Sequence, residues 1–432
     1  MTHFDSKSYL RWVKEYIKIN KGEIPQIITA NQYSRQKDRE YYQRLKSLAQ
    51  KFTKTYSLHA ITNELSEQKK FFRALYENKI YNPIFHYRKS SPLTFNKAAA
   101  LVKKLNAFRR EVSGDESALG QIYQRRIFDA EKAIILNSLS QKKGFSLASR
   151  EYYEFKKIKH SELPAKLSFP RNKQEIIEAY ETVYFAQKIL SKLGLKHRAK
   201  ISTIDSRLQG IITSRKNIKV GICTLRSPAR IIRSLAHEVL GHALISTNAR
   251  KYPAFFARHN SSASIRKEEG IAVKIGELAY QELQKFLTPQ ARSRRESLIP
   301  HLRLKAILLA RKKSFYQTFI TLTKLNINND LAWDLTLRAK RGLRSSEVKG
   351  ANYHDSLYFF GLKEINALIK QENLDLKQTF ILLDRLSQGK FDLVEFTFLK
   401  QHFINYKNIG LIPAFDIFKK ELTKIIQSKF IK

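Results

Sequence analysis

The stretch that decides the fold is residues 236–242, which read Ala-His-Glu-Val-Leu-Gly-His. It lies inside a run from Pro228 to Ser246 whose apolar positions recur at helical intervals, and proline suits the first turn of a helix. Two histidines, His237 and His242, therefore bracket a glutamate within a predicted helix. In a His-Glu-x-x-His helix, ring nitrogens one turn apart share a Zn²⁺ ion, and the glutamate faces the open water position of the metal.

The spacing of the two histidines is one residue longer than in that motif. At about 100° per residue, five residues leave an offset of about 140°, so a straight α-helix points the two rings apart. A shared metal therefore requires a local defect. A π-type bulge places five residues on one turn and occurs mostly at functional sites, and Gly241 is where backbone freedom costs least. The alternative is a pair of core histidines satisfied by hydrogen bonds.

A third ligand is expected nearby. Residues 264–272 read Ser-Ile-Arg-Lys-Glu-Glu-Gly-Ile-Ala at the start of another predicted helix, which ends near Phe286. Counted from Glu269, small residues recur along one face of this helix at Ala272, Gly276 and Ala279. Because small side chains let two helices approach closely, we prefer Glu269 as the third ligand and keep Glu268 as the alternative. Two acidic residues near a helix N-terminus are also favourable without a metal.

Composition favours a folded, helical and strongly basic protein. The chain has 432 residues, with 80 Lys and Arg against 38 Asp and Glu, so its formal charge is +42. Apolar residues make up 43% of it, which excludes a basic disordered chain, and 15 glycines and 10 prolines favour long helices over many short strands. The charge fits binding of nucleic acid or acidic lipid, attraction of acidic peptides, or a host with lysine-rich proteins. The single cysteine, Cys223, excludes an internal disulfide and a zinc site of several thiolates.

The sequence shows no targeting or membrane segment. The N-terminal residues run into Lys14, Lys18 and Lys21 without the apolar core of a signal peptide, which predicts a cytoplasmic protein. The longest apolar stretches, such as residues 306–310, are far shorter than the roughly 18 residues that span a bilayer. We therefore expect no membrane contact, and no nucleic-acid partner because no binding signature accompanies the spread of cations.

The pattern along the chain predicts an α+β fold that is predominantly helical. Three short β-branched runs separated by turn residues predict a small antiparallel sheet before the metal helix, with strands at residues 200–205, 210–214 and 217–222. The last of these strands is expected to offer an edge to an extended peptide. The chain divides into a basic helical N-terminal extension, a second helical part and a catalytic part with the sheet and the C-terminal helices, at residues 1–82, 83–198 and 199–432.

The metal motif followed by Glu-Glu-Gly-Ile-Ala at residues 268–272 resembles the microtubule-associated tyrosine carboxypeptidase family and its bacterial relatives, which are named after a Gln-Glu-Gly-Leu-Ala motif. Residues 83–87, Pro-Ile-Phe-His-Tyr, resemble the Pro-x-Phe-x-Tyr pattern of the family, and residues 338–342, Arg-Ala-Lys-Arg-Gly, resemble its Arg-x-x-Arg-Gly. Residues 352–361 agree with a downstream pattern, Phe-Thr-Lys-Asp-x-x-Tyr-Leu-x-Gly, at Asp355, Tyr358 and Gly361. The resemblance covers roughly residues 83–400.

This resemblance implies a zincin-like metallopeptidase with one Zn²⁺ per chain that removes a C-terminal Tyr or Phe. Eukaryotic members act on the tail of α-tubulin. In the family the glutamate before the glycine is the third zinc ligand, which corresponds to Glu269. The implied partner is a peptide or protein C-terminal tail, and an acidic tail suits the positive charge of the chain.

The expected roles of the remaining site residues follow from that reaction. With the three ligands in place, a fourth metal position stays open for water, and Glu238 is placed to take its proton and pass it to the leaving amine. A planar guanidinium suits the terminal carboxylate of the substrate, so Arg338 and Arg341 are candidates for binding it. Tyr358 is a candidate donor to the developing oxyanion. His354 stands where the family commonly has a substrate-binding lysine.

Two other functions stay open from sequence. One is a basic nucleic-acid or polyanion-binding protein with a degenerate metal site, which would show steeply salt-dependent binding and no bound zinc. The other is a zinc aminopeptidase or endopeptidase, because Glu-Gly-x-Ala also follows the metal helix in aminopeptidases. Only a carboxypeptidase needs the free C-terminal carboxylate of its substrate.

Overall fold

The computed structural model describes residues 5–21, 33–53, 61–87, 93–156, 158, 177–202, 211–214, 216–221, 227–288, 295–402 and 408–430. Helices dominate these ranges, as predicted, and one small sheet accompanies them. Within the same ranges no helix is both long enough and apolar enough to cross a bilayer. The first four residues, Cys223 and residues 203–205, 210 and 222 of the predicted strands lie outside the described part of the chain.

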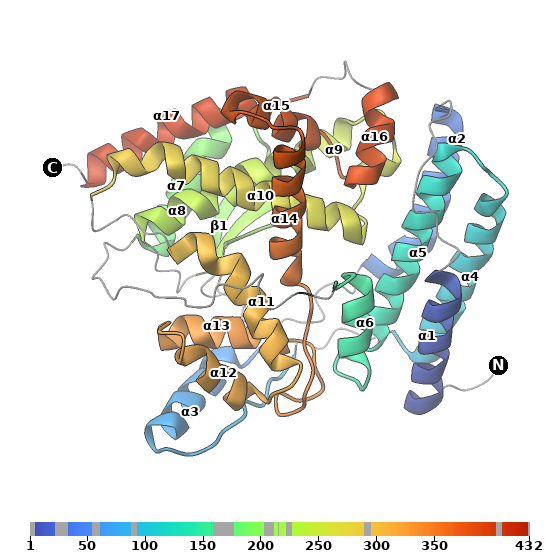
Figure 1. Ribbon diagram of the computed structural model, residues 1–432, viewed down its shortest axis with the longest axis horizontal. Helices are drawn as coiled ribbons and strands as arrows, with labels where there is room; N and C mark the ends of the chain where they lie inside the picture. Colours follow the sequence, from blue (N-terminus) through green and yellow to red (C-terminus); the bar gives the residue numbers. More distant parts are fainter. Residues whose placement is uncertain are drawn as a thin grey trace.

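The N-terminal helices gather at one end of the molecule, at the right of Figure 1. They are α1 (Ser6–Lys21), α2 (Arg35–Thr53), α4 (Phe95–Ser113), α5 (Ala118–Ser138) and α6 (Phe145–Tyr152). Tyr9 of α1 stacks on Phe95 with ring centroids 4.4 Å apart, and its hydroxyl lies 2.8 Å from Oγ of Ser138 in α5. The apolar residues of these helices belong to the same core cluster as those of the helical residues 228–251.

A second group of helices surrounds the ring of Trp333, at the bottom of Figure 1. It comprises α3 (Glu64–Tyr76), α11 (Ile299–Ala310), α12 (Phe315–Thr323) and α13 (Asn329–Lys340). Phe71 of α3 lies edge-on to Phe319 of α12 with ring centroids 4.8 Å apart, and its centroid lies 5.3 Å from that of Trp333. The helix that follows residue 61 therefore packs against helices more than 200 residues further along the chain.

The small sheet differs from the predicted antiparallel one. Its strands are β1 (Arg198–Ser202), β2 (Ile211–Thr213) and β3 (Asn217–Gly221), in the order β1-β3-β2. β2 pairs antiparallel with β3, but β1 pairs parallel with β3, so the prediction is wrong for that pair. Strand directions alternate along the chain, as expected. However, β3 lies between the other two strands and therefore pairs with β1, which runs in the same direction as β3.

The central place of β3 also contradicts its predicted role as a free edge. Ile218 and Val220 of this strand are fully buried, which suits a central strand, and its backbone is paired on both sides. The edges are β1 and β2. The helix α7 (Ala179–Lys192) packs against β1 and β3, and β2 packs against residues 236–243.

The helix after the sheet contains the predicted defect. It begins as α8 (Pro228–Leu235), where the Ser227 side chain accepts a hydrogen bond from the backbone N–H of Arg230, and ends as α9 (Leu244–Lys251). Between these two segments, Ala236–Ala243 is a π-helix. The structure thus confirms a π-type distortion at the two histidines, which a regular α-helix would have separated.

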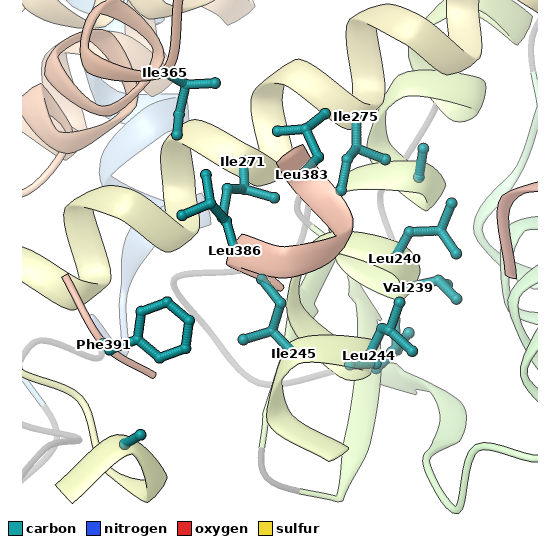
Figure 2. Packing of buried hydrophobic residues seen from close by; sticks show 14 of the residues in the cluster. Val239, Leu240, Leu244, Ile245, Ile271, Ile275, Ile365, Leu383, Leu386 and Phe391 are labelled. Atoms are coloured by element: carbon teal, nitrogen blue, oxygen red, sulfur yellow. The ribbon is translucent and has the colours of Figure 1, made fainter. Parts of the chain in front are cut away.

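Apolar packing holds the π-helix in place. Figure 2 shows Val239 and Leu240 of this segment and Leu244 of α9, which belong to the same buried cluster as Ile275 of α10 and Leu383. These side chains are buried. Three C-terminal helices complete this part of the fold: α15 (Leu376–Leu386), α16 (Leu393–His402) and α17 (Leu411–Phe430). Burial of this apolar face offsets the poorer hydrogen-bond geometry of the π-helix.

Helix α10 (Ser262–Leu283) lies between the π-helix and α14 (Ser356–Gln371), and Figure 1 shows α14 crossing it. At the crossing with α14, a Cβ atom added to Gly270 would lie 2.3 Å from the carbonyl carbon of Gly361. On the other side, a Cβ added to Gly241 would lie 2.4 Å from Cβ of Ala272. Gly241 therefore serves close helix packing, and the predicted stripe of small residues on α10 is the surface that makes contact.

Substituting the crossing glycine tests this constraint. A methyl group at Gly361 would lie 2.1 Å from the carbonyl oxygen of Arg266, which is backbone and cannot rotate away. We expect Gly361→Ala to lower the free energy of unfolding by about 1–3 kcal/mol. Gly114→Ala is the matched control, because a Cβ atom added to Gly114 would lie 3.5 Å from its nearest neighbour, which is an ordinary contact distance. Equal stability of the two variants in denaturant titrations would show that the crossing is not tight.

Candidate metal centre

Three side chains predicted as metal ligands converge at one point. The Nε2 atoms of His237 and His242 lie 3.1 Å apart, and Oε2 of Glu269 lies 3.3 Å from the first and 3.6 Å from the second. One possible ligand atom from each residue lies within 4.8 Å of the other two. Among the described residues, these three form the group of His, Cys, Asp or Glu side chains that could hold a metal ion.

The backbone explains why the side chains meet. Because residues five apart stack on one turn of a π-helix, His237 and His242 lie on the same face, with ring centroids 4.7 Å apart. Glu269 comes from the first half of α10, which is held against the π-helix at the contact between Gly241 and Ala272. The π-helix therefore positions the two histidines, and close helix packing positions Glu269 against them.

Glu268, the alternative ligand from sequence, makes a different contact. Its Oε1 lies 2.7 Å from Nδ1 of His242, and Nζ of Lys390 lies 3.8 Å from its other oxygen. Burial would raise the pKa of Glu268, but Lys390 and His242 lower it below its ordinary value. An ionised Glu268 accepts a hydrogen bond from the Nδ1–H of His242 and so leaves the lone pair of Nε2 directed at the centre, as carboxylates do behind metal-bound histidines.

The donor set fits a divalent metal ion. Oε2 of Glu269 is buried and makes no hydrogen bond to any described residue. Burial would raise the pKa of Glu269, but the imidazoles of His242 and His237 hold it well below its usual range. Burial would lower the pKa of His242, but Glu269 and Glu268 raise it well above its ordinary value. A buried carboxylate beside two imidazole nitrogens is the environment in which a cation replaces shared protons.

Glu238, the predicted general base, is fixed by the edge strand β2. Its Oε2 accepts a hydrogen bond of 2.7 Å from the backbone N–H of Thr213, and its carbonyl oxygen accepts one of 3.0 Å from the Thr213 hydroxyl. The side chain of Glu238 follows the first ligand, His237, directly in sequence. Strand β2 therefore holds the position of this carboxylate relative to the π-helix.

Tyr358 of α14 lies beside His237. Its ring stacks on that of His237, with centroids 5.8 Å apart and planes inclined by 18°. Burial, and after it the negative charge of Glu269, raise the pKa of the Tyr358 hydroxyl. The guanidinium of Arg303, from α11, lies 3.9 Å from the centroid of the same ring. The ring of Tyr358 therefore links a metal ligand to an arginine.

Arg338 belongs to a charged cluster beside this stack. Its Nε lies 3.1 Å from each carboxylate oxygen of Asp334, and one terminal nitrogen lies 3.3 Å from Oδ2 of Asp355. Burial would raise the pKa of Asp355, but Arg338 and Arg303 hold it well below its usual range. His354 lies at the outer side of the cluster, where its Nδ1 is 3.1 Å from Oδ1 of Asp355 and 42% of its side chain is exposed.

Arg341 contacts residues of the other motifs. Its carbonyl oxygen accepts a hydrogen bond of 3.1 Å from Asn352, and its charge lowers the raised pKa of the buried Tyr87 hydroxyl. That hydroxyl accepts a hydrogen bond of 2.9 Å from the backbone N–H of Gly342. The motif at residues 83–87 and the motif at residues 338–342 therefore pack against one another, and this contact supports the loop that leads to α14.

Sequence reasoning missed three residues that complete this region. Arg303 lies in an ordinary apolar helical run, Thr213 in a three-residue strand and Asp334 on the polar side of α13. None of them belongs to a motif with a fixed spacing. The only signal that could have drawn attention to Asp334 is its distance of four residues from Arg338, which favours an ion pair on one helix face.

The contact behind His242 can be tested through metal affinity. Glu268→Gln removes the negative charge from Nδ1 while the three proposed ligands remain, so we expect metal affinity to fall by about 10–100-fold. Glu282→Gln, which lies near the other end of α10, is the matched control and should leave the affinity unchanged. Competition with a chromogenic chelator gives the dissociation constants. An unaltered affinity in Glu268→Gln would contradict the orienting role.

Comparison with known proteins agrees with this arrangement. No curated protein sequence matches the chain. A family model described as microtubule-associated tyrosine carboxypeptidase matches residues 69–405. The matched region contains the π-helix, Glu268 and Glu269 of α10 and the cluster around Tyr358. The family implies tyrosine carboxypeptidase activity. This chain therefore belongs to the microtubule-associated tyrosine carboxypeptidase family.

Proposed function

We propose that this protein is a zinc-dependent carboxypeptidase with a zincin-like site, which releases a C-terminal Tyr or Phe from peptides or proteins. The observation that carries the proposal is the convergence of His237, His242 and Glu269 beside Glu238 and Tyr358. Two nitrogen ligands and one oxygen ligand match the donor sets of catalytic zinc sites, which keep one position open. A bound zinc ion supplies Lewis acidity, which acidifies water and polarises a carbonyl group.

Glu238 is the proposed general base and acid. Its side chain is almost fully buried, and the hydrogen bond from Thr213 occupies one carboxylate oxygen, Oε2. The other oxygen is available to take a proton from the attacking water and to return it to the leaving amine. Such a transfer contributes typically 10²–10⁴-fold to the rate when the carboxylate is fixed within hydrogen-bonding distance.

Tyr358 is the proposed hydrogen-bond donor to the developing oxyanion. Its raised pKa keeps the hydroxyl protonated at neutral pH, which a donor requires. The stack on His237 restricts the ring of Tyr358 and keeps it beside this proposed ligand.

The charge of the chain supports an acidic peptide tail as substrate. A formal charge of +42 produces a positive potential over much of the surface, which raises the encounter rate with acidic chains. Such steering weakens as ionic strength rises, because the Debye length is about 8 Å at 0.15 M salt. In this proposal the choice of substrate depends on two separate properties, which are the identity of the C-terminal residue and the acidity of the residues before it.

Glu238→Gln tests the mechanism. We expect the variant to bind zinc as the wild type does and to lose at least 10²-fold in kcat, because an amide cannot accept the proton of the attacking water. Metal analysis and release of tyrosine from a peptide ending in Glu-Tyr, followed by mass spectrometry, measure both quantities. Glu282→Gln should keep full activity. A Glu238→Gln protein with wild-type activity would exclude Glu238 as the base.

A matched pair of peptides tests the reaction class. One peptide ends in a free tyrosine carboxylate and the other in tyrosine amide, with the same preceding acidic residues. We expect the wild type to release tyrosine from the first only, to lose this activity with a chelator and to regain it with Zn²⁺. Cleavage of both peptides would indicate an endopeptidase, and removal of the N-terminal residue would indicate an aminopeptidase.

A further inference from the structure

The region beside the metal ligands holds two arginines with different surroundings. Arg338 is held by two carboxylates, because Asp334 pairs with its Nε at 3.1 Å and Asp355 with a terminal nitrogen at 3.3 Å. Arg303 makes no hydrogen bond to any described residue, and the nearest carboxylate oxygen, from Asp355, lies 3.7 Å from its Nε. A guanidinium must offer free N–H groups in a fork to bind a carboxylate from outside.

Arg303 is also accessible in the right part of its side chain. Its Nε is buried and makes no hydrogen bond to a described residue. The terminal nitrogens differ, because 17% of the side chain is exposed and neither terminal nitrogen is a buried atom that lacks a hydrogen-bond partner. The side chain therefore lies with its stem inside the protein and its terminal fork at the surface of the site. An incoming carboxylate can reach the two terminal nitrogens without displacing another group of the protein.

The position of Arg303 relative to the metal suits a substrate that is cleaved one residue from its end. The ring of Tyr358 contacts both groups, with its centroid 3.9 Å from the guanidinium carbon of Arg303 and 5.8 Å from the ring centroid of His237. In a carboxypeptidase substrate, the scissile carbonyl and the terminal carboxylate are one residue apart, which is about 3.8 Å along the chain. A carboxylate bound at Arg303 therefore leaves the preceding carbonyl close to the metal ligands and to the Tyr358 hydroxyl.

The local charge favours an added anion. The carboxylates of Asp334 and Asp355 face three guanidinium groups, from Arg230, Arg303 and Arg338, which together hold the pKa of Asp334 below its ordinary value against burial. Three positive groups around two negative ones keep both aspartates ionised. A substrate carboxylate enters this cluster next to the least neutralised arginine, so its desolvation is offset by an ion pair.

We propose that Arg303 binds the terminal carboxylate of the substrate and that Arg338, Asp334 and Asp355 are positioning residues, which hold the cluster and α14 in place. This inference rests on the proposed carboxypeptidase function and moves the carboxylate contact from Arg338 and Arg341, the candidates from sequence, to a residue outside every motif. Tyr358 then has two proposed roles, because its ring supports Arg303 and its hydroxyl is the proposed donor to the oxyanion.

The test measures peptide binding without turnover. In the zinc-loaded Glu238→Gln protein, the dissociation constants of the free-acid and amide peptides described above are compared by fluorescence anisotropy. We expect the free acid to bind at least 10-fold more tightly, and Arg303→Gln to remove this preference through a 10–100-fold loss for the acid alone. Arg303→Lys, which keeps the charge without the fork, should retain part of the preference. Arg311→Gln, at the end of the same helix, is the control and should retain all of it.

The outcomes separate the two proposals. Loss of the acid preference in Arg338→Gln but not in Arg303→Gln overturns the assignment of Arg303, and so does a full preference in Arg303→Gln with normal zinc content. In both cases release of tyrosine by the wild type leaves the carboxypeptidase function standing. A wild-type protein that releases no tyrosine, with no acid preference in the Glu238→Gln background, overturns both proposals.

Discussion

The contact on which the site depends is the approach of helix backbones on two sides of α10. Gly270 meets Gly361 of α14 on one side, and Ala272 meets Gly241 of the π-helix on the other. These contacts leave no room for a larger side chain, so they set the distance between Glu269, the two histidines and Tyr358. The Glu-Glu-Gly-Ile-Ala run therefore combines a ligand, its neighbour that orients His242 and the small residues that bring both to the other helices.

The site is built from the least regular segment of an otherwise regular helix. A π-helix has poorer hydrogen-bond geometry than an α-helix and persists where tertiary contacts stabilise it. Here such contacts include the buried apolar side chains of Val239, Leu240 and Leu244. The same distortion that costs stability brings His237 and His242 to one face, which is the pattern expected where local structure serves function.

The sequence predicted the parts of the site that depend on local spacing. The offset between His237 and His242 required a π-type bulge, and the stripe of small residues indicated which face of α10 makes close contact. The strand order and the contacts of Arg303 were not predictable, because they arise where segments far apart in the chain meet. The role of Gly241 was also misjudged, since its missing side chain matters for the approach of Ala272 and not for backbone freedom.

The π-helix is equivalent to an α-helix that has gained one residue, and this has a consequence for how the spacing can change. Deleting a residue between His237 and His242 would restore the four-residue separation and keep both rings on one face. The extra residue is taken up by the widened π turn, so its removal would leave a regular α-helix and largely preserve the register of α9. Leu244 and Ile245 would then keep their place in the core that buries them. The two histidine spacings are thus related by a single deletion that α9 can accommodate with little repacking.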